Sequence, residues 1–282
     1  MIENSTTKYI ITADDLGMSP GINWSISRAL EEELITNASI IANGDCFEAA
    51  VSNVISVHKN GTYGLHFNLE YGKPVSPPES VSHLLNSKGE LCLSFARLMR
   101  RTLVGNKEVY AREIKTELRA QISKLEQRNI EIKYIDSHRH IHAVPFVNKI
   151  VKNIAREKGI SQIRSYNESY IKTFIQVRSL SLLNPLKVIK YLLFKFFDFR
   201  NNSPRSSYFF SILLSSALMP EFAKRLSFDS GFKSVEIMVH LGNPELDKHF
   251  ITSNAIVNRF IKDPKRLSEY EFLIKLKKVF SK

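Results

Sequence analysis

Three short apolar segments, separated by segments of helical periodicity, constrain the fold more than any other feature of this chain. The segments 9–13 ("YIITA"), 38–43 ("ASIIAN") and 63–70 ("YGLHFNLE") have the length and the apolar, β-branched or aromatic character of buried strands. Residues 19–36 and 46–60, which lie between them, carry apolar side chains at helical spacing. This β-α-β-α-β order predicts a parallel sheet with helices packed outside it.

The rest of the chain continues this alternation. Further strands are expected at 130–136, 162–166 and 234–242, and further helices at about 108–129, 144–159 and 264–280. The length of 282 residues suits one α/β barrel domain. We therefore expect a single-domain α/β fold over residues 1–282, (β/α) barrel-like, with parallel strands and outer helices.

Residues 168–231 interrupt the alternation. They contain two apolar stretches, and neither reaches the roughly 20 residues needed to cross a bilayer. Within 187–197 we expect an amphipathic helix that carries Lys187, Lys190 and Lys195 on one face. One interpretation is a helical insertion packed on the core. The alternative is a basic patch that contacts an anionic membrane or a lipid-linked substrate.

The charge of the chain favours anionic partners. The net charge is +12, and between positions 172 and 205 seven basic residues face one acid. No nucleic-acid-binding motif accompanies this excess, so we expect no nucleic acid. Residues 1–8 lack a basic and apolar leader pattern, and the two cysteines, Cys46 and Cys92, are few and widely spaced. These features favour a cytoplasmic protein, with peripheral membrane association as the alternative.

Polar residues that carry catalytic or ligating groups gather where predicted strands end. In α/β barrels the carboxyl ends of the strands build the active site, so these positions are expected to meet. The residues are Asp14 with Asp15, His66, Asp136 with His138, His140 and His142, and His240.

The adjacent pair Asp14 and Asp15 raises a question of orientation. Neighbouring side chains on a regular strand point to opposite faces, but at a strand end both can reach one cavity. A bound cation would relieve their repulsion, with one carboxylate as ligand and the other free as a base. The alternative is a helix N-cap, for which Ser19 is already a candidate.

The histidines favour a metal site. If the segment "DSHRHIH" is extended, His138, His140 and His142 share one face, and Asp136 can orient an imidazole ring. A lone histidine such as His66 could equally be a core residue, but three histidines at alternate positions are harder to explain by packing alone. Together with Asp15, however, His66 and His138 make a set of one carboxylate and two imidazoles that leaves coordination positions open. His240 is a candidate general acid.

In order, these motifs resemble the YdjC-like family of carbohydrate deacetylases, which includes chitooligosaccharide deacetylases and a branch linked to hopanoid biosynthesis. The matching segments lie between positions 11 and 245 and read "ITADDLGMSPGINWSI", "TNASIIANG", "GLHFNLEYGKPV", "YIDSHRHIHAVP" and "VEIMVHLGNPE". The resemblance implies a (β/α) barrel-like fold and one divalent metal, magnesium or zinc. The late motif departs from the family, because Leu241 stands where proline is common.

The resemblance also implies roles. Asp15, His66 and His138 would be metal ligands, Asp14 the general base, and His240 a substrate-binding or general-acid residue. The expected reaction is metal-dependent hydrolysis of an N-acetyl group on an amino sugar, which releases acetate. His142 and His140 are alternative acids. Two other functions stay open: a different metal hydrolase, such as a phosphoesterase, and a non-catalytic, membrane-associated glycan-binding protein.

Overall fold

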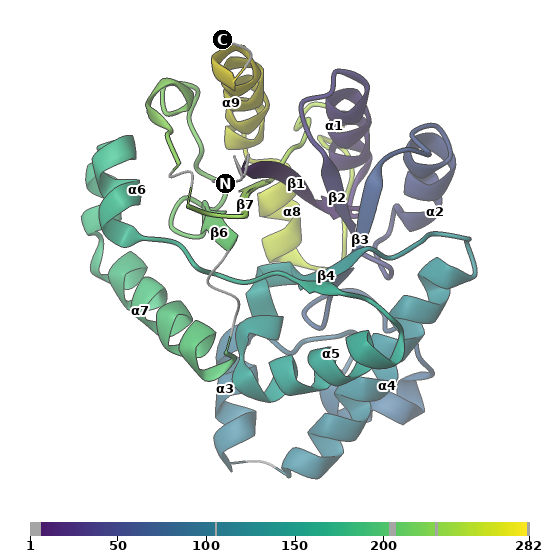
Figure 1. The fold of residues 1–282 in the computed structure, drawn as a ribbon. Coiled ribbons are helices and arrows are strands. Elements are labelled where there is room, and N and C mark those ends of the chain that lie inside the picture. The colour runs from purple at the N-terminus through teal and green to yellow at the C-terminus, as the bar shows by residue number, and fades with distance from the viewer. Residues whose placement is uncertain (1–6, 105, 203–206, 229–230, 281–282) are drawn as a thin grey trace.

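One curled parallel sheet organises the protein. The computed structural model describes residues 7–104, 106–202, 207–228 and 231–280 (Figure 1). In this part of the chain seven strands pair in the order β5-β4-β3-β2-β1-β7-β6, and every neighbouring pair is parallel. The strands are β1 Lys8–Leu16, β2 Asn37–Ile40, β3 Thr62–Phe67, β4 Tyr134–Ser137, β5 Gln162–Ile163, β6 Ser207–Phe210 and β7 Ser234–Val239. The predicted parallel α/β architecture is confirmed.

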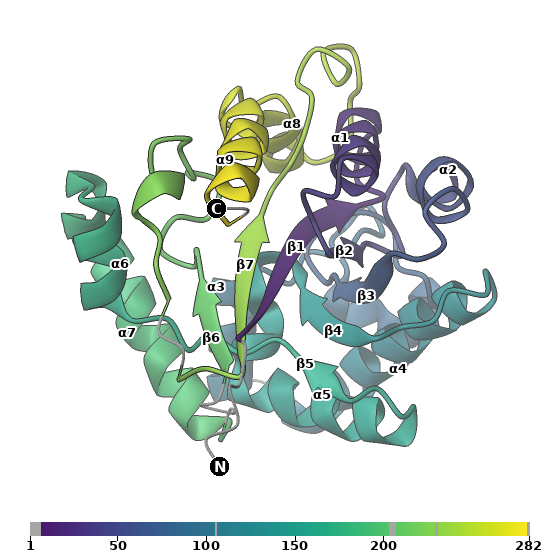
Figure 2. The ribbon, with the colours of Figure 1, turned by 45° about the horizontal axis from the view of Figure 1, so that its top comes forward.

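The two edges of the sheet approach each other, which makes the fold barrel-like (Figure 2). Strand β5 has only two residues, but the chain that follows it reaches β6. There the Phe209 N–H donates to the Asn167 carbonyl oxygen at 3.2 Å, and Asn167 Nδ2 donates to the Ser207 carbonyl oxygen at 3.0 Å. These two hydrogen bonds link the edges without a regular strand ladder between β5 and β6.

Helices surround the sheet, as predicted (Figures 1 and 2). They are α1 Pro20–Glu31, α2 Phe47–Ala50, α3 Phe95–Val104, α4 Lys107–Glu126, α5 Pro145–Glu157, α6 Tyr170–Val177, α7 Pro185–Arg200, α8 Ala255–Ile261 and α9 Lys265–Phe280. A π-helical turn, Val51–Ile55, continues α2. Ser19 caps α1, because its Oγ accepts the Ile22 N–H at 3.3 Å.

Several predicted boundaries differ from the structure. The expected strand 162–166 forms only β5, and α3 and α8 were not predicted. The region 168–231, expected to be a helical insertion, contains α6 and α7 but also contributes β6 to the sheet. Its strand was missed because β6 is four residues long and its pairing with β7 depends on tertiary contacts. Residues 1–6, part of the segment expected to lack a leader, lie outside the described residues.

Helix α7 turns a different side to solvent from the one predicted. Lys190 is half-buried and donates to the Ile212 carbonyl oxygen at 3.2 Å, and Lys195 donates to Asn167 Oδ1 at 3.2 Å. The outward side carries Leu192, Phe196 and other apolar residues instead. The three lysines therefore do not form the most exposed side of α7, because lysine stems can follow the protein surface to reach protein acceptors. No helix among the described residues has the length and apolarity to cross a membrane.

A bulge at the end of β1 positions the adjacent aspartates. Ala13 pairs with Ala38 of β2, but Leu16 pairs with Ile40, so β1 has one residue more than β2 over this interval. Asp15 adopts a positive φ of 72°. A bulge of this kind re-aims side chains next to the strand end, and here it lets Asp14 and Asp15 share one side of the sheet.

Gly17 allows the chain to leave this bulge. Its φ is +97°, and an added Cβ would lie 3.1 Å from the Ile41 carbonyl oxygen. Its N–H donates to Asn23 Oδ1 at 2.8 Å, which ties the turn to α1. The turn thus needs a residue without a side chain.

We predict that Gly17→Ala lowers the free energy of unfolding by about 1–3 kcal/mol, from left-handed strain plus steric contact. Gly89→Ala is the matched control, because Gly89 has φ +73° but no atom within 4 Å of the added Cβ. It should cost about 1 kcal/mol, from backbone strain alone. Urea unfolding measures both. Equal losses would show that the contact with Ile41 contributes nothing.

Candidate metal centre

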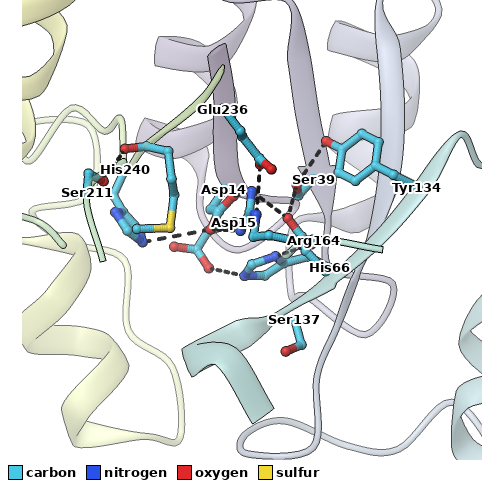
Figure 3. Close-up of polar contacts among 12 residues, drawn as sticks. Asp14, Asp15, Ser39, His66, Tyr134, Ser137, Arg164, Ser211, Glu236 and His240 are labelled. Carbon is cyan, nitrogen blue, oxygen red and sulfur yellow. Dashed lines mark hydrogen bonds and ion pairs between the residues drawn. The ribbon is translucent and has the colours of Figure 1, made fainter. Parts of the chain in front are cut away.

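Asp15, His66 and His138 meet at the carboxyl ends of β1, β3 and β4. Figure 3 shows Asp15 and His66 side by side. Asp15 Oδ1 lies 3.3 Å from His66 Nε2 and 2.9 Å from His138 Nδ1. One ligand atom from each residue lies within 4.8 Å of the others. The structure therefore brings together the three residues expected to be ligands.

The donor atoms of this cluster fit a divalent cation. Asp15 Oδ2 is buried and has no hydrogen-bond partner among the described residues. An unpartnered buried carboxylate oxygen is costly unless a cation or proton reaches it. One carboxylate and two imidazoles also leave coordination positions open for water and substrate. The cluster can thus hold a metal ion by its chemistry and its geometry.

Asp136 orients His66. Its Oδ1 accepts the Nδ1–H of His66 at 2.7 Å, and its Oδ2 accepts the hydroxyl of Ser39 at 2.7 Å. His66 Nε2 is thereby directed at Asp15. This is the carboxylate–histidine arrangement that fixes the tautomer and direction of a metal-ligating imidazole. The predicted orienting role of Asp136 matches this geometry.

Arg164 lies at the centre of the carboxylates and was not singled out from the sequence (Figure 3). Its Nη1 and Nη2 donate to Asp14 Oδ2 and Oδ1 at 2.9 and 2.8 Å, and Nη2 lies 2.7 Å from Asp136 Oδ2. Its Nε donates to Glu236 at 2.8 Å. Asp14, His66 and Asp136 form a second group of suitable ligands, but the Arg164 guanidinium already neutralises that group.

The buried charges of the site shift its pKa values strongly. Burial raises the pKa of Asp14 to about 6, against the lowering effect of Arg164. Burial also opposes ionisation of Asp15, but hydrogen bonds from His138 and His66 hold its pKa well below the usual range. Although burial disfavours a charged His66, Asp136 and Asp14 raise its pKa to about 10. The cluster therefore stabilises positive charge between its carboxylates.

The segment after β4 is not extended, so the predicted common face of the three histidines is wrong. Residues His138–Ala143 form a 3₁₀ turn, in which Arg139 and His140 have positive φ values of 49° and 62°. His138 and His140 line the site cavity. His142 is fully buried and lies between Ser137 Oγ, at 2.5 Å, and the Arg164 carbonyl oxygen, at 3.1 Å.

His240 faces Asp14 from the end of β7. Its Nε2 lies 4.0 Å from Asp14 Oδ2, and its backbone N–H donates to Glu269 Oε2 at 2.5 Å. Burial lowers the pKa of His240 to about 3, so its ring is neutral near pH 7. The structure thus places His240 beside the metal cluster, as the strand-end pattern predicted.

A cavity of about 530 Å³ opens above these residues. Its floor is polar and contains Asp14, Asp15, His66, His138, His140 and His240. Its walls are mainly apolar and come from α3, α7 and α8: Phe95, Leu186, Ile189, Leu193, Phe194, Ile256, Val257 and Phe260. A volume of this size accommodates a small ligand that carries both polar and apolar parts.

Fold and site together define an α/β barrel-like protein with a buried carboxylate–imidazole cluster suited to one divalent cation. The chain belongs to the YdjC-like protein family, whose sequence profile matches residues 8–277. This membership confirms the resemblance found in the strand-end motifs.

Several curated relatives are named carbohydrate deacetylase. The protein from Brevibacillus brevis is 35% identical over 150 residues, which cover 53% of this chain and 56% of the relative. The protein from Geobacillus stearothermophilus is 33% identical over 146 residues, which cover 52% of this chain and 55% of the relative. The chain thus spans about half the length of the curated relatives it matches.

A solved structure supports the fold over nearly the whole chain. A protein from Enterococcus faecalis, described as a putative cellobiose-phosphate cleavage protein, superimposes with a TM-score of 0.67 at 19% identity. The superposition covers 98% of this chain and 94% of that one. At this identity the likeness concerns the fold alone.

A sequence signal existed for some of the missed residues and not for others. Arg164 follows β5, so the strand-end rule that found Asp14 and His66 also applies to it. Glu269 and the cavity wall from α7 come from helices far along the chain, and no local pattern connects them to the strand ends. Their place follows only from the three-dimensional packing.

We predict that Asp15→Asn lowers zinc affinity by about 10-fold or more, since it removes the charged ligand whose Oδ2 has no other partner. Asp263→Asn, a change outside the cluster, should bind zinc as the wild type does. Isothermal titration and metal content after dialysis measure both. An Asp15→Asn variant that retains one zinc per chain with unchanged affinity would contradict the ligand set.

Proposed function

We propose that this protein is a metal-dependent hydrolase that removes an N-acetyl group from an amino sugar or sugar-containing substrate. One observation carries the proposal: the unpartnered carboxylate oxygen of Asp15 lies with two imidazoles beside Asp14, at the floor of a cavity. The curated relatives named carbohydrate deacetylase support the sugar and the bond attacked. Acetate and a free amine are the products.

Asp15, His66 and His138 are the proposed ligands. A divalent ion held by them would supply Lewis-acid chemistry, which polarises a carbonyl group and lowers the pKa of water. Mixed carboxylate and imidazole ligation suits both magnesium and zinc, and two histidines favour zinc. The ligands hold the reacting groups at the bottom of the cavity, where apolar walls exclude bulk water.

Asp14 is the proposed general base. With a pKa of about 6 its carboxylate is ionised near pH 7, and it can take a proton from the attacking water. Arg164 holds this carboxylate through two hydrogen bonds, and each oxygen keeps a further lone pair for the water. Arg164 is thus a positioning residue, and Asp14 is the residue that moves the proton.

The proton must then reach the departing nitrogen as the C–N bond breaks. His240 is the proposed donor, because its Nε2 lies near Asp14 Oδ2 and its ring lines the cavity. Because the pKa of His240 is about 3 and that of Asp14 about 6, a free imidazolium is disfavoured, and the imidazole relays the proton to the amine in one concerted step as the C–N bond breaks. His142 is less suited to this role, since Ser137 and the Arg164 carbonyl already engage its ring.

Two alternative functions fit the site less well. A two-metal phosphoesterase needs a second ion about 3.5–4 Å from the first. The group that would hold it, Asp14 with His66 and Asp136, is neutralised by Arg164. A glycan-binding protein without catalysis does not require a buried carboxylate such as Asp14 beside the ligand cluster. The cytoplasmic location is also a proposal, supported by the free cysteines Cys46 and Cys92.

We predict that Asp14→Asn lowers kcat for acetate release by about 10²–10⁴-fold, the contribution of a general base, while bound metal remains. N-acetylated sugars and phosphate esters, assayed with zinc or magnesium added, provide the test. Asp263→Asn is again the control and should retain activity. Wild-type turnover by Asp14→Asn would exclude the base assignment, and hydrolysis of phosphate esters alone would exclude the deacetylase.

A further inference from the structure

An exposed apolar surface covers α6, the 3₁₀ turn Leu180–Leu183 and α7, at the left of Figure 1. We refer to it as the α6–α7 face. Its most exposed members, Leu180, Leu186 and Phe199, have 79%, 75% and 72% of their surface accessible. The complete set is Ile171, Ile175, Leu180, Leu183, Leu186, Ile189, Leu192, Phe196 and Phe199. Tyr170 of α6 contacts Tyr191 of α7, so the exposed residues come from neighbouring elements, and a large exposed apolar surface of this kind marks an interaction surface.

The charges on the α6–α7 face are of one sign. Arg178 and Arg200 are exposed at its borders. The segment 170–202 has one acidic residue, Asp198, and its Oδ1 accepts the Tyr166 N–H at 3.1 Å. An apolar surface with basic neighbours complements a bilayer, with hydrocarbon beneath anionic headgroups.

The α6–α7 face continues into the mouth of the cavity. Leu186 and Ile189 are exposed on α7 and also line the cavity. On the opposite wall, Ile256 of α8 lines the cavity with 61% of its surface accessible. The entrance is therefore mainly apolar, with the exposed Arg139 beside it, although the floor carries the charged cluster.

We propose that the α6–α7 face docks on an anionic lipid bilayer and so presents the cavity mouth to the membrane surface. Given the proposed deacetylase function, the substrate class that fits is an N-acetylated sugar carried on a lipid anchor. The polar floor receives the sugar, and the apolar rims contact the first part of the lipid. A second copy of the chain is a poorer occupant, because a two-fold interface would bring the same basic residues together.

Co-sedimentation with vesicles tests the docking. Wild-type protein should bind vesicles of equal parts phosphatidylcholine and phosphatidylglycerol at low salt, and release them as salt rises. The triple variant Leu183→Ser, Leu192→Ser and Phe196→Ser should bind at least about 10-fold more weakly, because these side chains supply apolar area that docking would bury. All three lie outside the cavity. Arg178→Gln with Arg200→Gln should weaken binding and its salt dependence.

Matched controls separate the α6–α7 face from general surface effects. Val57→Ser, Leu246→Ser and Leu267→Ser change three exposed apolar residues outside this face, and should bind vesicles like the wild type. Equal binding by the wild type and the Leu183, Leu192 and Phe196 variant would overturn the proposal. A wild-type dimer that this variant converts to monomer, without vesicle binding, would also overturn it and assign the face to self-association.

Activity assays distinguish a failure of the docking proposal from a failure of the deacetylase proposal. The Leu183, Leu192 and Phe196 variant should release acetate from short water-soluble N-acetylated sugars at the wild-type rate, and lose rate only on lipid-anchored sugars in vesicles. If no N-acetylated sugar is hydrolysed but vesicles are bound, the deacetylase proposal fails and docking stands. If soluble and vesicle-bound substrates respond identically to the variant, the lipid-anchored substrate class is excluded.

Discussion

The ion pairs of Arg164 hold the site together. Asp14 and Asp136 are both fully buried, and their charges are tolerable only because one guanidinium donates to both. That arrangement leaves Asp15 as the carboxylate that Arg164 does not contact, next to His66 and His138. The arginine thus separates the three aspartates into two that are neutralised by the protein and one that is left for a cation.

Backbone geometry makes this division possible. The bulge in β1 brings two consecutive side chains to one side of the sheet, and the positive φ values of Arg139 and His140 turn the chain sharply after His138. Strained conformations of this kind cost energy and persist where the surrounding structure over-determines them. Here the hydrogen-bonded network around Asp136 and the tight turn at Gly17 supply that constraint.

Sequence patterns predicted the parts of this protein that repeat a simple period. The buried strands β1, β3 and β7 were predicted because parallel strands read as continuous apolar runs, and their polar ends marked Asp15, His66 and His240. The bulge and the 3₁₀ turn break that period, so the shared face of His138, His140 and His142 was wrong. The direction of α7 depended on whether Lys190 found a buried acceptor, which only the packing decides.

The short strand β5 separates the strand ends that carry the site residues from the segment that forms part of the cavity wall. Between β5 and β6 the chain forms α6 and α7, and hydrogen bonds of Asn167 and Ser169 with β6 replace a strand ladder there. None of Asp14, Asp15, His66, His138 or His240 belongs to this segment. Replacement of residues 170–200 during evolution can therefore change which molecules enter the cavity while the residues at its floor stay intact. Related proteins can thus differ in substrate range and keep the same site residues.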